Sequence, residues 1–261
     1  MNKLEFNYHT HTYRCGHAVG EDEQYVINAI KLGIKKLGFS DHVMLPSGFD
    51  QPGIRGSFSK LEDYLHSIGL LKEKYKDQIE IFVGFEAEYY PQMMDYYKWL
   101  LKNKIDYLIM GQHCYLKDNK FHWYFHKDSP VEDVKKYTDD VIKGLKTGLF
   151  KYLAHPDLFM HSQAGFSKGL EEQSRCILKA CEELNIPIEI NLCGMRRRDY
   201  DGVNYSYSND FFFDLVKDYK VDVILALDAH DPNDINQEEL DKGYAFAKKH
   251  GIKVLEKFDI K

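Results

Sequence analysis

Histidine side chains in this sequence collect at the ends of short apolar segments. Six of the twelve histidines end such a segment and a seventh follows one closely, while two acidic residues hold equivalent positions. The nine residues are His9, His11, His17, His42, Glu86, His113, His155, Asp228 and His230. Neutral imidazole and carboxylate groups are the ligands that Zn, Fe or Mn accept in proteins. The sequence therefore predicts a site for several metal ions.

The spacing of these residues favours metal binding over a purely structural role. A single histidine at the end of a strand is more often a hydrogen-bonded core or surface residue than a ligand. However, His9 and His11 are two residues apart, as are Asp228 and His230. Residues two apart in an extended strand point to the same side. Each pair can therefore present two ligands to one place.

The elements that must position these residues alternate between strands and helices. Apolar runs predict strands at Leu4 to His9, Lys36 to His42, Ile79 to Glu86, Asp106 to His113, Tyr152 to His155, Ile186 to Leu192 and Val221 to Asp228, with a weaker one at Ile252 to Phe258. In parallel α/β barrels the carboxyl ends of the strands form the active-site face. We therefore expect the histidines to converge there.

Helical patterns lie between the predicted strands. One runs from Glu21 to Leu32 and ends at Gly33, and another follows a Ser59-x-x-Glu62 capping box. No repeat, low-complexity tract or linker interrupts the 261 residues. We expect a single α/β domain of barrel type over residues 1–261.

Composition and charge exclude several classes of protein. Hydrophobic residues make up 44% of the chain, which is enough for a globular core. The net charge of −6 gives no basic field for a nucleic acid or an anionic membrane, and the one basic cluster is Arg196 to Arg198. No apolar run is long enough to span a membrane. The five scattered cysteines are typical of free thiols in the cytoplasm. The sequence does not indicate an oligomeric state.

Several of these residues belong to longer motifs. The motifs are His9-Thr10-His11-Thr12, Cys15-Gly16-His17-Ala18, Ser40-Asp41-His42, Gly84-Phe85-Glu86, Ala154-His155-Pro156-Asp157 and Asp228-Ala229-His230, with His113 between them. In order and spacing they resemble the polymerase-and-histidinol-phosphatase (PHP) superfamily along nearly the whole chain. Gly194-Met195-Arg196-Arg197 is similar to a Gly-Leu-Arg-Lys segment of its histidinol-phosphatase branch. The resemblance implies a distorted seven-stranded (β/α) barrel with three divalent transition-metal ions, Zn, Fe or Mn.

The resemblance also implies a ligand set for each ion. The first set is His9, His11, Glu86 and Asp228, the second is Glu86, His113 and His155, and the third is His17, His42 and His230. Glu88 is an alternative to Glu86, since both lie on one strand face. The family places its glutamate directly after Gly-x, which favours Glu86. Three or four protein ligands per ion leave open positions for water and substrate, as in catalytic sites.

The charge of such a site favours an anionic substrate. Three divalent ions outweigh two carboxylates, so a dianionic phosphate compensates the charge better than a neutral amide does. The resemblance implies hydrolysis of a phosphomonoester, L-histidinol phosphate, through a metal-bridging hydroxide. Arg196, helped by Arg197, would hold the phosphoryl oxygens, although a solvated basic loop is the alternative. Asp41 would protonate the leaving alkoxide, or else it only orients His42.

Departures from the branch leave other functions open. Met160 follows Asp157-Leu158-Phe159 where a basic residue is usual, and Tyr205-Ser206-Tyr207-Ser208 replaces a Tyr-Pro-Ser segment. Another phosphomonoester could therefore be the substrate. Aromatic segments such as Trp123-Tyr124-Phe125 either line the pocket or belong to the core. The remaining alternatives are a metal-dependent nuclease, for which a basic groove is lacking, and an inactive metal-binding module with a structural or regulatory role.

Overall fold

Four parallel strands form the first part of the sheet. The computed structural model describes residues 2–124, 131–162, 168–201 and 207–260. The larger sheet has the order β1-β2-β3-β4. These strands are β1 (Phe6–Asn7), β2 (Lys36–His42), β3 (Glu80–Ala87) and β4 (Tyr107–Met110), and every neighbouring pair is parallel. The register places His42 opposite Glu86, so the carboxyl ends of β2 and β3 lie level.

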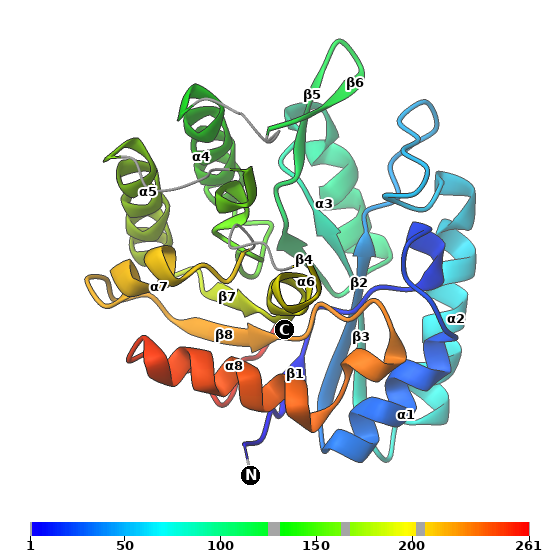
Figure 1. Cartoon of the computed structure of the whole chain (residues 1–261). Helices are drawn as coiled ribbons and strands as arrows, with labels where there is room; N and C mark the ends of the chain where they lie inside the picture. The colour runs from blue at the N-terminus through cyan, green and yellow to red at the C-terminus, as the bar shows by residue number, and fades with distance from the viewer. Residues whose placement is uncertain (1, 125–130, 163–167, 202–206, 261) are drawn as a thin grey trace.

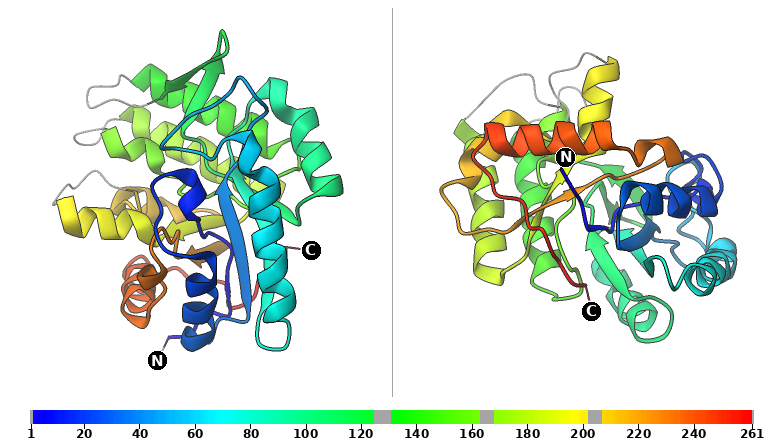
Figure 2. Two further views of the ribbon diagram at one scale, coloured as in Figure 1. Left: turned by 90° about the vertical axis from the view of Figure 1, so that its right-hand side faces the viewer. Right: turned by 90° about the horizontal axis from the view of Figure 1, so that it is seen from below.

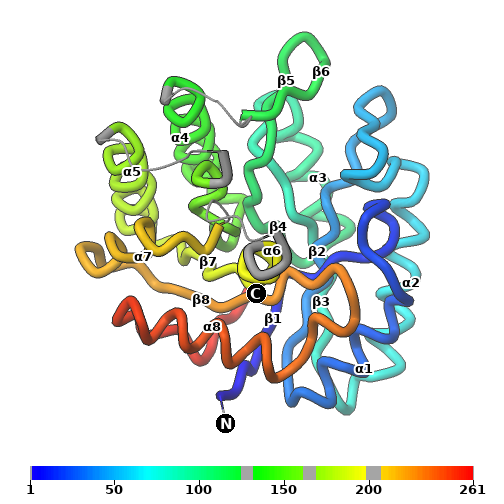
Figure 3. The backbone as a smooth tube through the Cα atoms, viewed as in Figure 1, coloured from blue at the N-terminus to red at the C-terminus, as the bar shows by residue number. Residues whose placement is uncertain are grey.

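The sheet continues past β4 through a single residue. Leu153 bridges Met110 on one side and the start of β7 on the other. β7 (Ile188–Asn191) then pairs in parallel with β8 (Val223–Ala226). In the view of Figure 3, β1 to β3 lie on one side of a helix seen end-on, and β7 and β8 lie on its other side.

The segments that follow β8 and β1 meet each other. Ala229 forms a parallel bridge with Thr10, and the backbone N–H of His11 donates to the carbonyl oxygen of Ala229 at 2.9 Å. The parallel sheet is therefore curled, and its two edges approach at the level of the predicted metal ligands. The prediction of an α/β fold is confirmed in this form.

Eight helices are described; the helix that follows β7 is the one seen end-on at the centre of Figure 1, and the other seven surround the strands (Figures 1 and 2). They are α1 (Asp22–Leu32), α2 (Leu61–Lys74), α3 (Met94–Asn103), α4 (Val131–Leu145), α5 (Lys168–Leu184), α6 (Leu192–Asp201), α7 (Asp210–Val216) and α8 (Gln237–Lys249). α6 begins directly after β7 and contains Arg196 to Arg198, for which a solvated basic loop was the alternative. The start of α1 carries a capping box between Glu21 and Gln24.

One antiparallel hairpin departs from the alternation of strands and helices. β5 (Cys114–Lys117) and β6 (Lys120–Trp123) project beyond the other elements at the top of Figure 1. The turn between them contains Asp118 and Asn119 with φ angles of 52° and 57°. Two successive residues with positive φ are typical of the tight turns that join hairpin strands. The sequence prediction ended this strand at His113 and missed the hairpin.

Aromatic side chains fill the space inside the curled sheet. This inner cluster includes Phe6, Tyr8, Phe82, Tyr107, Ile109, Tyr152 and Ile224, all at most 2% exposed. The hydroxyl of Tyr107 donates to the carbonyl oxygens of Tyr8 and Phe39. A Cβ atom on Gly38 or Gly84 would lie within 2.4 Å of the Tyr107 side chain, so only glycine fits at these positions. Much of the aromatic content therefore serves the core below the site.

Some predicted elements are shorter or differ in detail. The strand expected over Leu4 to His9 is reduced to Phe6–Asn7. The weak strand at Ile252 to Phe258 is a single bridge at Val254. The capping box proposed at Ser59 is wrong, because residues 58–60 form a separate 3-10 turn and α2 begins without a side-chain cap.

Two further features concern the cysteines and the search for membrane-spanning helices. All five cysteines are free thiols, and Cys176 is the exposed one. Within the described ranges, none of the helices is both long and apolar enough to cross a membrane.

Candidate metal centre

Glu86 lies at the centre of a cluster of imidazoles. It is next to the last residue of β3 and is 1% exposed. Its Oε1 atom lies 2.7 Å from Nε2 of His155 and 3.5 Å from Nε2 of His113. Its Oε2 atom lies 3.1 Å from Nδ1 of His42. Both oxygens of this carboxylate therefore face imidazole nitrogens, as a ligand that bridges two ions must.

Asp228, which follows β8, forms the second focus of the cluster. Its Oδ1 atom lies 3.1 Å from Nε2 of His11, 3.4 Å from Nε2 of His9 and 3.4 Å from Nδ1 of His230. The same nitrogens of His9 and His11 lie 3.6 Å from Oε2 of Glu86. The two carboxylates thus share this histidine pair. As predicted from their spacing, His9 with His11, and Asp228 with His230, direct their side chains into the same cluster.

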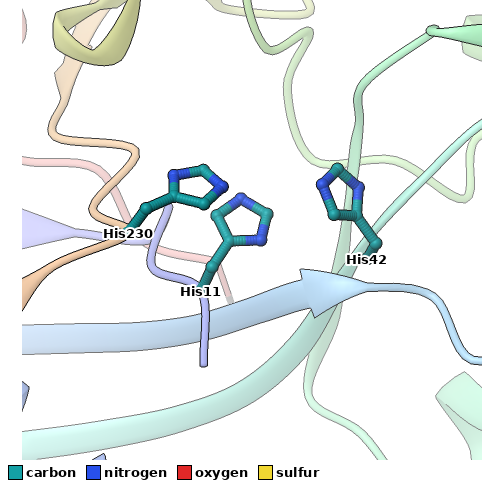
Figure 4. Close-up of side chains that lie close together, drawn as sticks. All are labelled: His11, His42 and His230. Carbon is teal, nitrogen blue, oxygen red and sulfur yellow. The ribbon is translucent and has the colours of Figure 1, made fainter. Parts of the chain in front are cut away.

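Three histidines from distant parts of the chain come together beside these two carboxylates. Figure 4 shows His11 after β1, His42 at the end of β2 and His230 after β8. The rings of His11 and His230 are stacked with centroids 4.1 Å apart, and those of His11 and His42 are 4.6 Å apart. His17, which is exposed, places its Nε2 atom 3.1 Å from Nε2 of His230.

All nine predicted ligands belong to this one cluster, although their grouping differs from the expected sets. Groups whose ligand atoms lie within 4.8 Å of one another include His9 with His11 and Asp228, His9 with Glu86 and His155, His42 with Glu86 and His113, and His11 with His42 and His230. His42 therefore faces Glu86 as well as His230. It can serve the second ion or the third.

Two of the candidate ligands have an unusual backbone. His155 and Asp228 have φ angles of 29° and 45°, which non-glycine residues rarely adopt. Such strain persists where the surrounding structure imposes it and is common at functional sites. In both cases the residue ends a strand-like segment, and its side chain turns into the cluster.

A second layer of polar residues orients the candidate ligands, and sequence reasoning missed two of its members. Nδ1 of His9 lies 3.0 Å from Oε2 of Glu189, and Nδ2 of Asn191 donates to Oδ2 of Asp228 at 3.0 Å. A carboxylate on the far nitrogen sets the tautomer of a histidine ligand. The available signal was the alternation of polar Glu189 and Asn191 in an otherwise apolar strand.

The cluster holds several buried polar atoms that find no hydrogen-bond partner within the described part of the chain. They are Nε2 of His9, both ring nitrogens of His11, Nδ1 of His42, Nδ1 of His155 and Oδ1 of Asp228. Leaving such atoms buried without a partner costs about 1–3 kcal/mol each. Imidazole nitrogens and carboxylate oxygens that converge in this way fit divalent metal ions.

Electrostatics prepare these groups as ligands. Burial opposes the ionisation of Glu86, but the imidazoles of His113 and His42 outweigh it and hold the pKa of Glu86 well below its usual value. Burial, with the charge of His11, lowers the pKa of His230. Burial also lowers the pKa of His11, but the nearby carboxylates of Asp228 and Asp41 outweigh it and raise that pKa to about 9.

Comparisons with known proteins agree with this geometry. Residues 7–192 match the family described as the PHP domain. The chain belongs to the PHP domain family. It is 24% identical over 265 residues to a histidinol-phosphatase of Bacillus subtilis, covering 91% of this chain and 95% of the relative. The family expected from the motifs is confirmed.

Solved structures share the fold of this PHP domain. The histidinol phosphate phosphatase of Lactococcus lactis, complexed with zinc, L-histidinol and phosphate, has a TM-score of 0.72 at 18% identity, covering 97% of this chain and 96% of that one. Metal-dependent tyrosine phosphatases from Bacillus subtilis and Streptococcus pneumoniae give a TM-score of 0.51 at 15% identity, covering 94% and 87%. At these identities the likeness establishes the fold alone.

The two arginines in the middle of α6 have different places in this PHP domain. Arg196 donates from Nη2 to the carbonyl oxygens of Leu227 and Asp228 at 2.9 Å each. Its other nitrogens lie 3.2 Å from Oε2 of Glu239 and 3.3 Å from Oδ1 of Asp234. Its contacts therefore support the backbone that carries Asp228 and do not support the phosphate-binding role predicted for Arg196.

Arg197 lines the cavity instead. Consecutive residues on a helix point about 100° apart, so one of the two arginines can face the protein while the other faces the site. Among the described residues that line the cavity, Arg197 is present and Arg196 is not. Arg197 is exposed. Its guanidinium is the one that a bound anion in this cavity would meet.

Asp41 lies beneath the cluster. It is fully buried and is not among the described residues that line the cavity. Its Oδ2 atom accepts from the hydroxyl of Thr12 at 2.5 Å, and its Oδ1 atom lies 3.6 Å from Nδ1 of His11. These contacts favour the orienting role over the acid role predicted for Asp41, and the imidazole it faces is that of His11 rather than His42.

The cluster forms the floor of a cavity of about 470 Å³. Its upper walls include Ile54, Trp123, Leu158 and Tyr207, which are apolar or aromatic. Trp123 is 43% exposed, whereas its neighbour Tyr124 is 1% exposed and donates to Asp140 at 2.7 Å. Of the aromatic segment singled out in the sequence, one ring therefore lines the pocket and one belongs to the core. Phe125, Tyr205 and Ser206 lie outside the described residues.

Proposed function

We propose that this PHP domain is a metal-dependent phosphomonoesterase whose substrate is L-histidinol phosphate. The observation that carries the proposal is a cavity lined by eight of the nine imidazole and carboxylate groups and by Arg197, with His9 buried behind them. The choice of substrate is supported by the Bacillus subtilis relative, a histidinol-phosphatase, and by the Lactococcus lactis phosphatase, whose structure contains L-histidinol and phosphate.

We further propose that the site holds three divalent ions. Glu86 and Asp228, with His9 and His11, would hold the first ion. His113 and His155, with Glu86, would hold the second ion. His17 and His230 would hold the third ion. His42, which faces both Glu86 and His230, joins either of the last two. Bound there, Zn, Fe or Mn would polarise the phosphoryl group and lower the pKa of a water molecule.

The protein's own residues then bind and orient the substrate. Arg197 presents a planar fork of N–H donors suited to phosphoryl oxygens. Arg196 holds the carbonyl of Asp228, and Asp41 orients His11, so both act as positioning residues. The walls at Ile54, Trp123 and Tyr207 exclude water and offer an apolar surface to the ring of the leaving alcohol.

The same proposal includes the seven-stranded count of the barrel. Counting Leu153 as one strand position, the pairing runs through β1, β2, β3, β4, Leu153, β7 and β8. The bridge between Thr10 and Ala229 supports closure of the ring. We also propose that the protein works in the cytoplasm on a small-molecule substrate and does not use nucleic acid.

Phosphate release from three phosphomonoesters, together with nucleotide release from single-stranded DNA, tests this function. The panel contains histidinol phosphate, phosphotyrosine, glycerol phosphate and single-stranded DNA, and we expect kcat/KM for histidinol phosphate to exceed the others by at least about tenfold. Exhaustive chelation should abolish activity, and zinc, iron or manganese should restore it.

Each alternative has its own result in this assay. Preference for phosphotyrosine or glycerol phosphate would replace the substrate and keep the chemistry. Preference for DNA would favour the nuclease. Full activity after chelation would overturn the metal-dependent mechanism, and no activity in the metal-loaded protein would favour the inactive module.

A further inference from the structure

A buried ion pair lies beside the metal cluster and has no part in the function proposed so far. Arg55, in the segment between β2 and α2, donates from Nη2 to Oε1 of Glu88 at 2.9 Å. The side chains are 1% and 0% exposed. Burying two charges is costly, and a buried pair of this kind is weak evidence for stability alone. Its retention next to the site calls for another explanation.

Glu88 connects this pair to a candidate ligand. The same Oε1 atom that accepts from Arg55 lies 3.2 Å from Nδ1 of His113. The opposite nitrogen of His113, Nε2, lies 3.5 Å from Oε1 of Glu86. An Nδ1–H group that donates to Glu88 leaves the lone pair of Nε2 directed at the cluster.

Arg55 keeps Glu88 available as an acceptor. The carboxylate of Glu88 is fully buried, and the guanidinium of Arg55 donates to the same Oε1 atom that faces Nδ1 of His113. Since Arg55 and Glu88 carry opposite charges, the pair orients His113 without adding net charge to the centre. Glu88 therefore acts behind a ligand and is not a substitute for Glu86.

Arg55 also anchors a wall of the cavity. Its Nη1 donates to the carbonyl oxygen of Val43 at 3.1 Å, and its Nε donates to Oε1 of Gln51 at 3.0 Å. These contacts hold the segment whose Gly53 and Ile54 line the cavity. One side chain thus contacts both the support of a metal ligand and the support of the substrate wall.

We propose that Arg55 and Glu88 are a positioning pair that directs Nε2 of His113 at the metal centre and ties the Gly53–Ile54 wall to it. The pair makes two separable contributions. Glu88 supports His113, whereas Arg55 supports both Glu88 and the wall. The inference rests on the proposed function only where it concerns the substrate.

The test separates these contributions with Glu88→Gln, Arg55→Met and the double variant. Zinc retention against a competing chelator is measured without substrate, and kcat and KM are measured with the best substrate of the panel. We expect each single variant to retain zinc about 10–100-fold more weakly, the usual effect of removing a residue that orients a ligand. The double variant should be no weaker than the weaker single one, because both changes act on His113. KM should rise in Arg55→Met and stay within twofold in Glu88→Gln.

Arg55→Lys keeps the charge with a smaller set of donors and should recover part of the zinc retention, and it replaces Arg55→Met if that protein does not fold. Unchanged zinc retention in folded Glu88→Gln and Arg55→Met, or in Arg55→Lys where Arg55→Met does not fold, would overturn the proposal. Losses that multiply in the double variant would show that the two residues act independently and would overturn the pairing. Because zinc retention needs no substrate, failure of the phosphatase assay leaves this result readable.

Discussion

The floor and the rim of the cavity differ in how their residues are held. At the floor, Glu86, His155 and Asp228 are at most 3% exposed, and strand ends and buried partners position them. At the rim, Trp123 is 43% exposed and Arg197 is exposed, and a hairpin and the first turns of a helix carry them. Under the proposed function, the metal ligands thus lie mainly where burial fixes their side chains, and the residues that would contact the substrate lie where side chains are exposed.

Substitution at the floor should have the largest effect. Glu86→Gln removes the charge of the carboxylate that faces His42, His113 and His155, so we expect weaker metal binding and a loss of at least about 10³-fold in kcat/KM, about 4 kcal/mol. Elemental analysis and steady-state kinetics measure both. The matched control is Glu80→Gln, which changes an exposed residue at the opposite end of β3. Normal metal content and activity in Glu86→Gln would break the distinction between floor and rim.

The two neighbouring arginines should give effects of different kinds. Arg197→Ala should lose about 1.5–3 kcal/mol of transition-state binding, about 10–150-fold in kcat/KM, with metal content unchanged. Arg196→Ala leaves the buried carboxylate of Glu239 without this partner, so we expect a loss of about 3 kcal/mol in the free energy of unfolding together with weaker metal retention at Asp228. Denaturant titration, steady-state kinetics and elemental analysis on both variants distinguish a loss of transition-state binding from a loss of stability and metal retention. If the Arg196 variant loses activity while stability and metal content stay normal, Arg196 holds the phosphate after all.

The smallest effect is expected at the aromatic wall. Trp123→Ala should raise KM about tenfold for histidinol phosphate, since it removes an aromatic contact with the ring of the substrate, and less than twofold for glycerol phosphate. Trp123→Phe should recover most of the loss. Trp99 on α3 is also 43% exposed but does not line the cavity, so Trp99→Ala is the matched control. Equal changes for both substrates would show that Trp123 shapes the rim without contacting the ring.

The sequence was most informative about strands that end in a ligand. The run from Lys36 to His42 corresponds to β2 residue for residue, and six of its seven residues are buried. The sequence was less informative about a segment that joins the sheet through a single β-bridge on each side. Tyr152 to His155 reads as a strand, but in the curled sheet only Leu153 forms a bridge on each side.

The partners that support the ligands could not be read from local patterns. Glu189 lies 180 positions from His9, and Arg55 lies 33 positions from Glu88. No spacing rule links such residues, and their contacts exist only when the strands are placed side by side. The hairpin of β5 and β6 was missed for a different reason: the turn signal at Asp118 and Asn119 was present but was not used.

The sequence by itself determined the alternation of strands and helices, the family, and the nine residues that converge, because parallel strands bring their carboxyl ends to one face whatever the connections between them. Tertiary structure alone decided which of two adjacent arginines enters the cavity and which supports Asp228. Both have the same chemistry and differ by one helical step of about 100°. Which direction faces the site depends on where β8 and α8 place Leu227, Asp234 and Glu239, and those positions follow only from packing of the whole fold.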